Sequence, residues 1–224
     1  MTLLNNVISK LDGLRTLIVY DSPLAVRAIL LGHILPYYSN KNVYIIIYSE
    51  SMCRRAKKSY ESFIKICSEK AKMLDKINII KIGFNKDVPF GNLYEFINLN
   101  ESWYDRLSNI IKNFDKKDII IFHGFSLVQL MYREDWVIKE LKFFDGIPSD
   151  TTIINKISNN FYRDWIKGVM KKLHDVVIRV EKSETSLLDH EESYLIGVEE
   201  SIVADLPTFC SRFKLSEDGV FEEC

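Results

Sequence analysis

The first residues whose types and spacing could do chemistry lie at positions 21–28, between an apolar run and a helical pattern. Phosphate-binding loops of the form GxxxxGKS/T occupy such a strand-to-helix junction, because their glycines let backbone N–H groups wrap a phosphate. When this pattern is laid over the segment, Asp21 takes the place of the first glycine and Val26 that of the second. Arg27 takes the place of the lysine, and Ala28 that of the Ser/Thr.

Each of these replacements weakens a phosphate site. Val26 is β-branched and resists the tight turn, and the carboxylate of Asp21 would repel a phosphate. Ala28 has no hydroxyl to hold Mg²⁺, while Arg27 keeps a positive charge on a planar fork that differs from a compact ammonium. The segment is therefore interpreted as a degenerate phosphate loop. Arg27 could still bind an anion at a helix N-terminus, but we expect it to pair with Asp21 or Asp12.

Two further residues end apolar runs. His123 ends the run at 118–123, where a nucleotide site would need an Asp to position Mg²⁺. A neutral imidazole is a poor partner for a hard cation, so we expect no metal here and a hydrogen-bonded residue at a strand end. Glu50 follows the run at 43–48, and we expect it to be a solvated carboxylate.

A basic and aromatic segment at 161–172 could contact nucleic acid by stacking on bases and pairing with phosphates. The residues that would do so are Phe161, Tyr162, Arg163, Trp165, Lys167, Lys171 and Lys172. The alternative is an amphipathic helix with aromatic residues in the core and lysines in water, and the balanced overall charge favours it. A second basic stretch, Cys53–Lys58, begins a long helical pattern.

Apolar runs alternate with helical patterns along most of the chain, which indicates βαβ units around a buried parallel sheet. The predicted strands lie at 16–20, 43–48, 77–82, 118–123 and 151–157, and the predicted helices at 23–35, 51–74, 103–114, 126–144 and 162–173. Three more strands at 175–181, 194–199 and 209–215 are separated by loops alone, so the sheet should end in antiparallel pairs. The pattern predicts one α/β domain over residues 1–224.

Composition narrows the classes of function. With 30 basic and 31 acidic residues the net charge is −1, so any nucleic-acid contact must come from a local patch. The four cysteines form no CxxC pair and are expected to be free thiols in a reducing compartment. The apolar runs are too short to span a bilayer, and no signal peptide is recognised. We expect a cytoplasmic protein with no membrane contact and no metal.

The order of elements resembles that of RecA-superfamily ATPases of the KaiC and archaeal RadA-paralogue kind, from about Gly13 to Glu222. Tyr44–Ser51 is similar to the second core strand of that family, and the tail at 204–223 to its closing hairpin. The resemblance implies a three-layer RecA-like P-loop NTPase fold. It also implies that Glu50 stands where the family has a catalytic base, and Asn155 where it has a polar nucleotide-sensing residue.

The function that this resemblance implies is that of a catalytically inactive RadA-paralogue-like protein in DNA recombination and repair. It would need no cofactor, with ATP not favoured, and would act by assembly with a protein partner or itself and with DNA or RNA. One alternative is a weak ATPase or nucleotide sensor that uses Arg27 and Glu50. A second is an Elongator-like scaffold subunit that binds RNA, and a third is a KaiC-like signalling protein that binds protein partners only.

Overall fold

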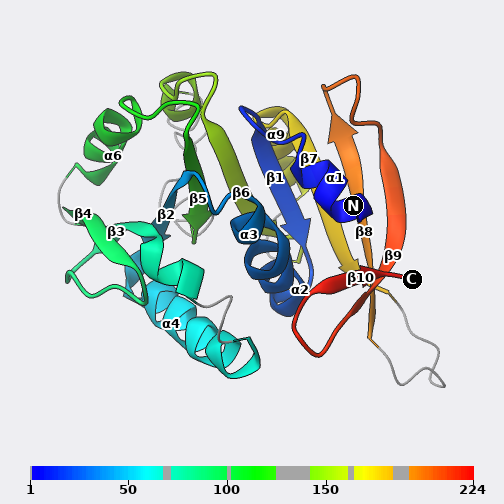
Figure 1. Ribbon diagram of the computed structural model, residues 1–224. Helices are drawn as coiled ribbons and strands as arrows, with labels where there is room; N and C mark the ends of the chain where they lie inside the picture. Colours follow the sequence, from blue (N-terminus) through cyan, green and yellow to red (C-terminus); the bar gives the residue numbers. More distant parts are fainter. Residues whose placement is uncertain (1, 68–71, 100–101, 125–141, 161–163, 184–191) are drawn as a thin grey trace.

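The computed structural model of the chain describes residues 2–67, 72–99, 102–124, 142–160, 164–183 and 192–224 (Figure 1). Its centre is a ten-stranded sheet with the strand order β10-β9-β8-β7-β1-β6-β5-β2-β3-β4. The strands are β1 (Arg15–Tyr20), β2 (Asn42–Tyr48), β3 (Asn78–Gly83), β4 (Asn92–Asn98), β5 (Asp118–His123), β6 (Thr152–Ser158), β7 (Val176–Lys182), β8 (Ser193–Ser201), β9 (Phe209–Leu215) and β10 (Phe221–Glu223).

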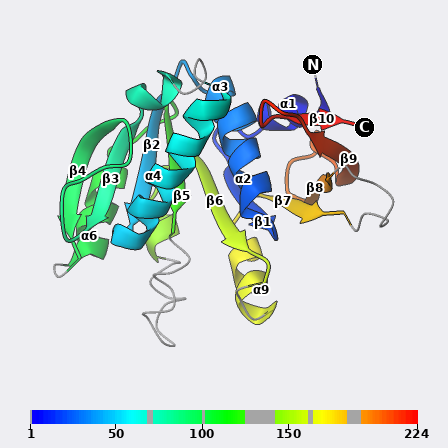
Figure 2. The same cartoon turned by 90° about the horizontal axis from the view of Figure 1, so that it is seen from below.

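Helices cover both faces of this sheet. Those described are α1 (Leu3–Ile8), α2 (Pro23–Ile29), the π-helical turn η1 (Leu30–Ile34), α3 (Leu35–Tyr37), α4 (Ser49–Ile66), the 3-10 turn η2 (Lys72–Lys76), α6 (Trp103–Ile111) and α9 (Asp164–Lys172). Helices α2, α3 and α4 lie on one face, and α6 and α9 lie on the other (Figure 2). The predicted three-layer α/β architecture is confirmed.

Strand directions also follow the prediction. The strands from β7 through β1, β6, β5, β2 and β3 to β4 run parallel to one another. The pairs β7–β8, β8–β9 and β9–β10 are antiparallel. Two strands, β6 and β5, separate β1 from β2. The carboxyl ends of these four strands therefore meet at one edge, which is where open α/β sheets bind ligands.

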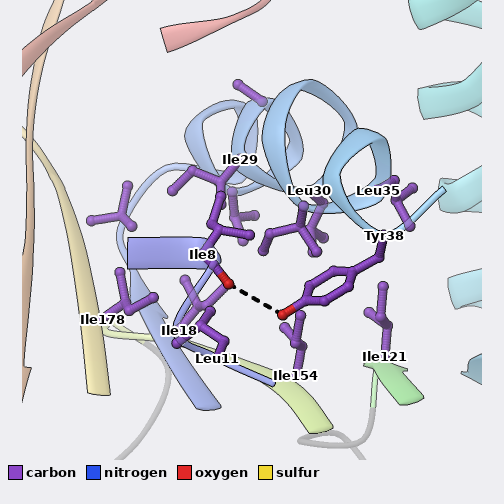
Figure 3. Packing of buried hydrophobic residues seen from close by; sticks show 14 of the residues in the cluster. Ile8, Leu11, Ile18, Ile29, Leu30, Leu35, Tyr38, Ile121, Ile154 and Ile178 are labelled. Atoms are coloured by element: carbon purple, nitrogen blue, oxygen red, sulfur yellow. Dashed lines mark hydrogen bonds between the residues drawn. The ribbon is translucent and has the colours of Figure 1, made fainter. Parts of the chain in front are cut away.

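The larger core lies between the sheet and the helices α1, α2 and α3. Ile18, Ile121 and Ile154 project from three neighbouring strands against Ile29 of α2, and all four are at most 1% exposed (Figure 3). Tyr38 closes this cluster, and its hydroxyl donates to the Ile8 carbonyl at 3.2 Å. The bond satisfies the one polar atom that the ring brings into the core.

The opposite face of the same strands forms a second core with α6. Ile46, Ile80 and Phe122 point to this side and pack with Trp103 and Leu107 of the helix. Because neighbouring residues of these strands are buried on opposite faces, the runs are apolar throughout, as expected of parallel strands covered on both sides.

His33, in η1, joins the two ends of the described chain. Its Nδ1 lies 3.1 Å from Asn5 Oδ1 in α1, and its Nε2 accepts a hydrogen bond from the Phe221 N–H of β10 at 3.0 Å. Since Nε2 accepts, the proton of the neutral ring must be on Nδ1, which donates to Asn5. This His33 clasp explains why η1, α1 and β10 lie together in Figure 1.

Several elements differ from the sequence prediction. The chain forms β4 and α1, which were not expected, and α4 ends at Ile66 where a helix was expected to run to residue 74. β10 pairs with β9 as the closing hairpin that the resemblance implied. β4 and β10 are edge strands with one buried residue each, so they lack the apolar pattern of the central strands. Most of the helix predicted at 126–144 lies outside the described residues. Among the described helices, none has the length and apolarity to cross a membrane.

Candidate functional site

The junction between β1 and α2 is much shorter than an eight-residue phosphate loop, because it consists of Asp21 and Ser22 alone. Ser22 caps the helix by accepting from the Ala25 N–H at 3.3 Å, and Pro23 occupies the first turn. The Val26 N–H already donates to the Ser22 carbonyl at 3.2 Å. A backbone N–H that a phosphate loop would offer to its ligand is thus used inside the helix.

Asp21 binds the end of the neighbouring strand. Both of its carboxylate oxygens accept from the Lys182 N–H, at 3.1 and 3.0 Å, and its own N–H donates to the Val180 carbonyl. The expected pairing of Arg27 is wrong, because Asp12 pairs with Lys41 at 3.0 Å. Within the described part of the chain, Arg27 has no ion-pair partner.

The other residues of the predicted loop lie on α2. Val26 and Ala28 are buried, at 6% and 4% exposure, and belong to the larger core. Arg27 is half-buried, and its side chain lines a cavity. Of the four residues, only Arg27 combines a free charge with access to such a space.

This cavity has a volume of about 510 Å³ and is bounded by α2, η1, α3 and α4 above the carboxyl ends of β1, β2, β5 and β6. Its apolar lining comes from both helical walls and from the sheet: Leu24, Val26, Leu30, Leu31, Leu35, Ile45, Ile47, Met52, Ala56, Leu74, Phe90 and Ile121. The charged or titratable lining residues are Arg27, Arg55, His123 and Lys156, with hydroxyls from Tyr20, Ser59, Tyr60 and Ser158. No Asp or Glu among the described residues lines it.

His123 and Lys156 are neighbours in the titratable part of the cavity lining. His123 ends β5 and Lys156 lies on β6, and Lys156 Nζ is 2.8 Å from His123 Nδ1. The prediction of His123 as a hydrogen-bonded residue at a strand end agrees with this contact. Burial, with the nearby charges of Lys156 and Arg55, holds the pKa of His123 well below its ordinary value. Burial lowers the pKa of Lys156 to about 7, so near neutral pH its amine is only partly protonated.

Glu50, the residue at the position of a catalytic base, is bound by the protein itself. Its Oε2 accepts from Lys81 Nζ at 2.9 Å, and its Oε1 accepts from the N–H groups of Phe84 and Asn85. Burial alone would raise the pKa of Glu50, but these hydrogen bonds outweigh it and lower the pKa. The expected solvated carboxylate is found only in part, since the Glu50 side chain is 36% exposed but is also bound to the fully buried Lys81.

Local backbone geometry makes room for the Glu50–Lys81 pair. Ser49 adopts a φ of 74°, which is uncommon for a residue with a side chain, and turns the chain from β2 into α4. A Cβ at Gly83 would lie 2.5 Å from Glu50 Oε1, so only glycine leaves the carboxylate in place. The pair is thus built into the junction of two elements.

Asn155, the position of the nucleotide-sensing residue, is fully buried on the opposite side of β6 from Lys156. Its Oδ1 accepts from the Lys156 N–H at 2.8 Å, and its Nδ2 has no hydrogen-bond partner among the described residues. Asn155 does not line the cavity described above. The structure therefore separates it from His123 and Arg27.

The basic and aromatic segment is described only in part, since Phe161, Tyr162 and Arg163 lie outside the described residues. On α9, Trp165 is 54% exposed. Lys167 pairs with Asp164 at 2.8 Å, and Lys171 pairs with Glu199 at 2.6 Å. Lys172 lies 3.8 Å from Glu200 and is largely exposed. The lysines described here are therefore neutralised in part by neighbouring carboxylates.

Sequence reasoning missed Lys156, Arg55 and Tyr20, which the fold brings together with Arg27 and His123. A signal for Lys156 exists in the sequence, because it is a charged residue within the apolar run at 152–158. Arg55 falls in the basic stretch at 53–58, where sequence alone does not separate it from its neighbours.

Metal-binding chemistry finds no support in the residues that the structure describes. They contain no group of three or more His, Cys, Asp or Glu side chains that could hold an ion. All four cysteines are free, as expected.

The same fold occurs in solved structures of low sequence identity. The KaiC-like protein PH0186 of the hyperthermophilic archaeon Pyrococcus horikoshii OT3 has a TM-score of 0.65 at 13% identity, over 94% of this chain and 90% of that one. A second protein of P. horikoshii OT3, PH0250, has a TM-score of 0.63 at 15% identity, over 90% and 94%. The RadB recombinase has a TM-score of 0.51 at 10% identity, over 95% and 91%.

Comparison of the sequence with protein-family models finds no match, and neither does comparison with curated proteins. The likeness therefore lies in the fold, which extends over nearly the whole of each chain. The fold implied by the sequence resemblance is confirmed: this chain has the RecA-like α/β fold of KaiC-like proteins and RadB.

Proposed function

We propose that this chain is a RecA-like protein that does not hydrolyse ATP and that acts by assembly. The observation that carries the proposal is the two-residue junction between β1 and α2, in which Asp21 binds the Lys182 N–H. A phosphate loop needs free backbone N–H groups at this place, and an anionic side chain beside them opposes a triphosphate.

The other groups that ATP hydrolysis requires are also absent or occupied. His123 stands at the Mg²⁺-positioning place and is hydrogen-bonded to Lys156. Glu50 could activate a water only by giving up Lys81, which would then be a fully buried and uncompensated charge. These two contacts support a role without ATP turnover.

Assembly is supported by the free edge of the sheet at β4. This strand pairs with β3 on one side only, and Leu93 and Tyr94 are 37% and 50% exposed. An unpaired strand edge with exposed apolar side chains is a ready site for pairing with another chain. We propose that β4 forms the contact with a second copy of the chain or with a protein partner.

Recombination and repair is the process suggested by the resemblance to RadA paralogues. A nucleic-acid contact on α9 would rest on Trp165 and the largely exposed Lys172, because Lys167 and Lys171 are closely paired with carboxylates, and even Lys172 lies 3.8 Å from Glu200. This balance of charge favours assembly with protein as the main role.

Phosphate release from ATP in the presence of Mg²⁺ tests the first half of the proposal. We expect the purified chain and its Glu50→Gln variant to be indistinguishable from a protein-free control. Steady Mg²⁺-dependent turnover that Glu50→Gln abolishes would overturn the proposal and establish the weak-ATPase alternative. Circular dichroism of both proteins confirms that they are folded.

Sedimentation velocity tests the second half. If the chain associates with itself through β4, the wild type should form a larger species as its concentration is raised to about 100 μM, a range suited to micromolar association. Leu93→Glu should shift this equilibrium to the monomer by at least tenfold, whereas Ile202→Glu, at a residue 76% exposed elsewhere, should not. A wild type that remains monomeric throughout would remove self-assembly from the proposal.

A further inference from the structure

The cavity at the carboxyl edge of the sheet is lined by two chemically different sets of side chains, one cationic and one apolar. We propose that it binds an amphipathic anion, a small molecule with a carboxylate or phosphate head and an apolar body. This inference is independent of the proposed function, because neither assembly through β4 nor the absence of ATP turnover requires an occupied cavity.

The positive charges in the cavity lining have no counter-charge among the residues that the structure describes. Arg27 of α2 and Arg55 of α4 have no ion-pair partner there, and no described carboxylate lines the cavity. Among the described residues, the Lys156 amine has only the neutral imidazole of His123 as a hydrogen-bond partner. Arginine forks bind carboxylate and phosphate oxygens in pairs, so an anionic head group would supply the missing acceptors.

The apolar part of the lining determines what kind of body must be attached to the anionic head group. Leu30, Leu31 and Leu35 form one wall, and Ile45 and Ile47 lie on the sheet below them. A polar sugar or a chain of phosphates in this space would lose its hydrogen bonds to water without replacement. An alkyl or similar apolar body gains by the same burial. The volume of about 510 Å³ falls within the range typical of small-molecule sites.

The site does not resemble an incomplete hydrophobic core. Unfilled space inside a core is lined by apolar atoms, whereas this cavity carries two arginines, a lysine and four hydroxyl groups from Tyr20, Ser59, Tyr60 and Ser158 on its lining. Convergent polar groups above an apolar surface are the usual features of a ligand site.

Titration calorimetry with decanoate tests the proposal, with acetate and 1-decanol as probes that carry only the head or only the body. We expect saturable binding of decanoate and at least tenfold weaker binding of acetate and decanol. Along the series hexanoate, octanoate and decanoate, each added methylene should tighten binding by up to about fourfold, as full burial predicts. Replacing decanoate with decyl phosphate shows whether the cavity binds a carboxylate or a phosphate head group more tightly.

Neighbouring arginines on α4 provide a matched pair of variants. Arg54 and Arg55 are both exposed, but only Arg55 lines the cavity. Arg55→Ala and Lys156→Met should each weaken decanoate binding about tenfold, while Arg54→Ala should leave it unchanged. Equal loss in Arg54→Ala and Arg55→Ala, or no saturable binding of decanoate and decyl phosphate, would overturn the proposal. So would ATP binding more tightly than either probe.

Discussion

Two lysines on parallel strands show how differently one fold can treat a buried amine. Lys81 on β3 is fully buried and donates to Glu50, to Asn85 and to the Asp87 carbonyl. Lys156 on β6 has the imidazole of His123 in place of a carboxylate. The charge of Lys81 is compensated by Glu50 within the protein. The charge of Lys156 has no carboxylate partner among the described residues, so an anionic ligand could compensate it. The difference separates a structural ion pair from a candidate binding site.

Energetics support this distinction. Breaking a buried ion pair by removing one partner is expensive, because the remaining charge is left without compensation. A lysine whose burial lowers its pKa to about 7 instead loses its proton when no anion is near. Lys81 should therefore stabilise the fold only as part of a pair, whereas Lys156 should lower stability in exchange for a chemical role.

The largest expected effect comes from breaking the compensated pair. Glu50→Ala should lower the free energy of unfolding by about 2–3 kcal/mol, because Lys81 loses its only carboxylate; this is below the full cost of a buried pair since Glu50 is partly exposed. Chemical denaturation at pH 7 measures the loss. Glu50→Gln should cost less, because its amide oxygen can still accept from Lys81.

Lys156→Met is the matched control for that experiment. It should change the free energy of unfolding at pH 7 by no more than about 1 kcal/mol, because an apolar side chain of similar length replaces a strained amine. If Glu50→Ala costs no more than Lys156→Met, the contrast between the two lysines is wrong.

A smaller effect should appear in the pH dependence of stability. The pKa of Lys156 is about 7 in the folded chain against an ordinary value of 10.5, so between these values the unfolded chain binds a proton that the folded chain has released. The free energy of unfolding of the wild type should therefore rise with pH in this window relative to Lys156→Met, by about 2 kcal/mol. Below pH 7 both states hold the proton and the difference should be constant.

The groups that face Lys156 are present in both proteins of this comparison. They are His123 of β5, Arg27 of α2, Arg55 of α4 and Tyr20 of β1, whose pKa is raised by burial and lowered in part by Arg55. Their contributions largely cancel when the variant is subtracted. Denaturation curves at pH 7, 8 and 9 provide the measurement, and parallel curves for wild type and variant would contradict the assignment.

Most of the fold could be predicted from the sequence because its central strands are buried on both faces. Apolar runs such as Ile119–Phe122 have few other interpretations, and Pro23 after Ser22 marks a helix start. β4 escaped prediction because only one of its seven residues is buried, so it lacks the apolar run of the central strands. The same Pro23 argues against an eight-residue loop.

The candidate site could be predicted only in fragments. Arg27 and His123 could be recognised from their places near the ends of apolar runs. That they line the same cavity as Lys156 and Arg55 depends on the strand order β1-β6-β5-β2. Local patterns carry no information about that order. Glu50 was expected in water because its partner, Lys81, lies 31 residues away on another strand.

The His33 clasp has a consequence for folding of the protein during its synthesis on the ribosome. It joins α1 to Phe221, which is separated from His33 by 188 positions. Until Phe221 emerges, the apolar side of α1 and η1 lacks the strand that covers it. Nascent chains therefore hold an uncovered core while the residues between His33 and Phe221 are made, a period in which chaperones and aggregation compete for the same surface.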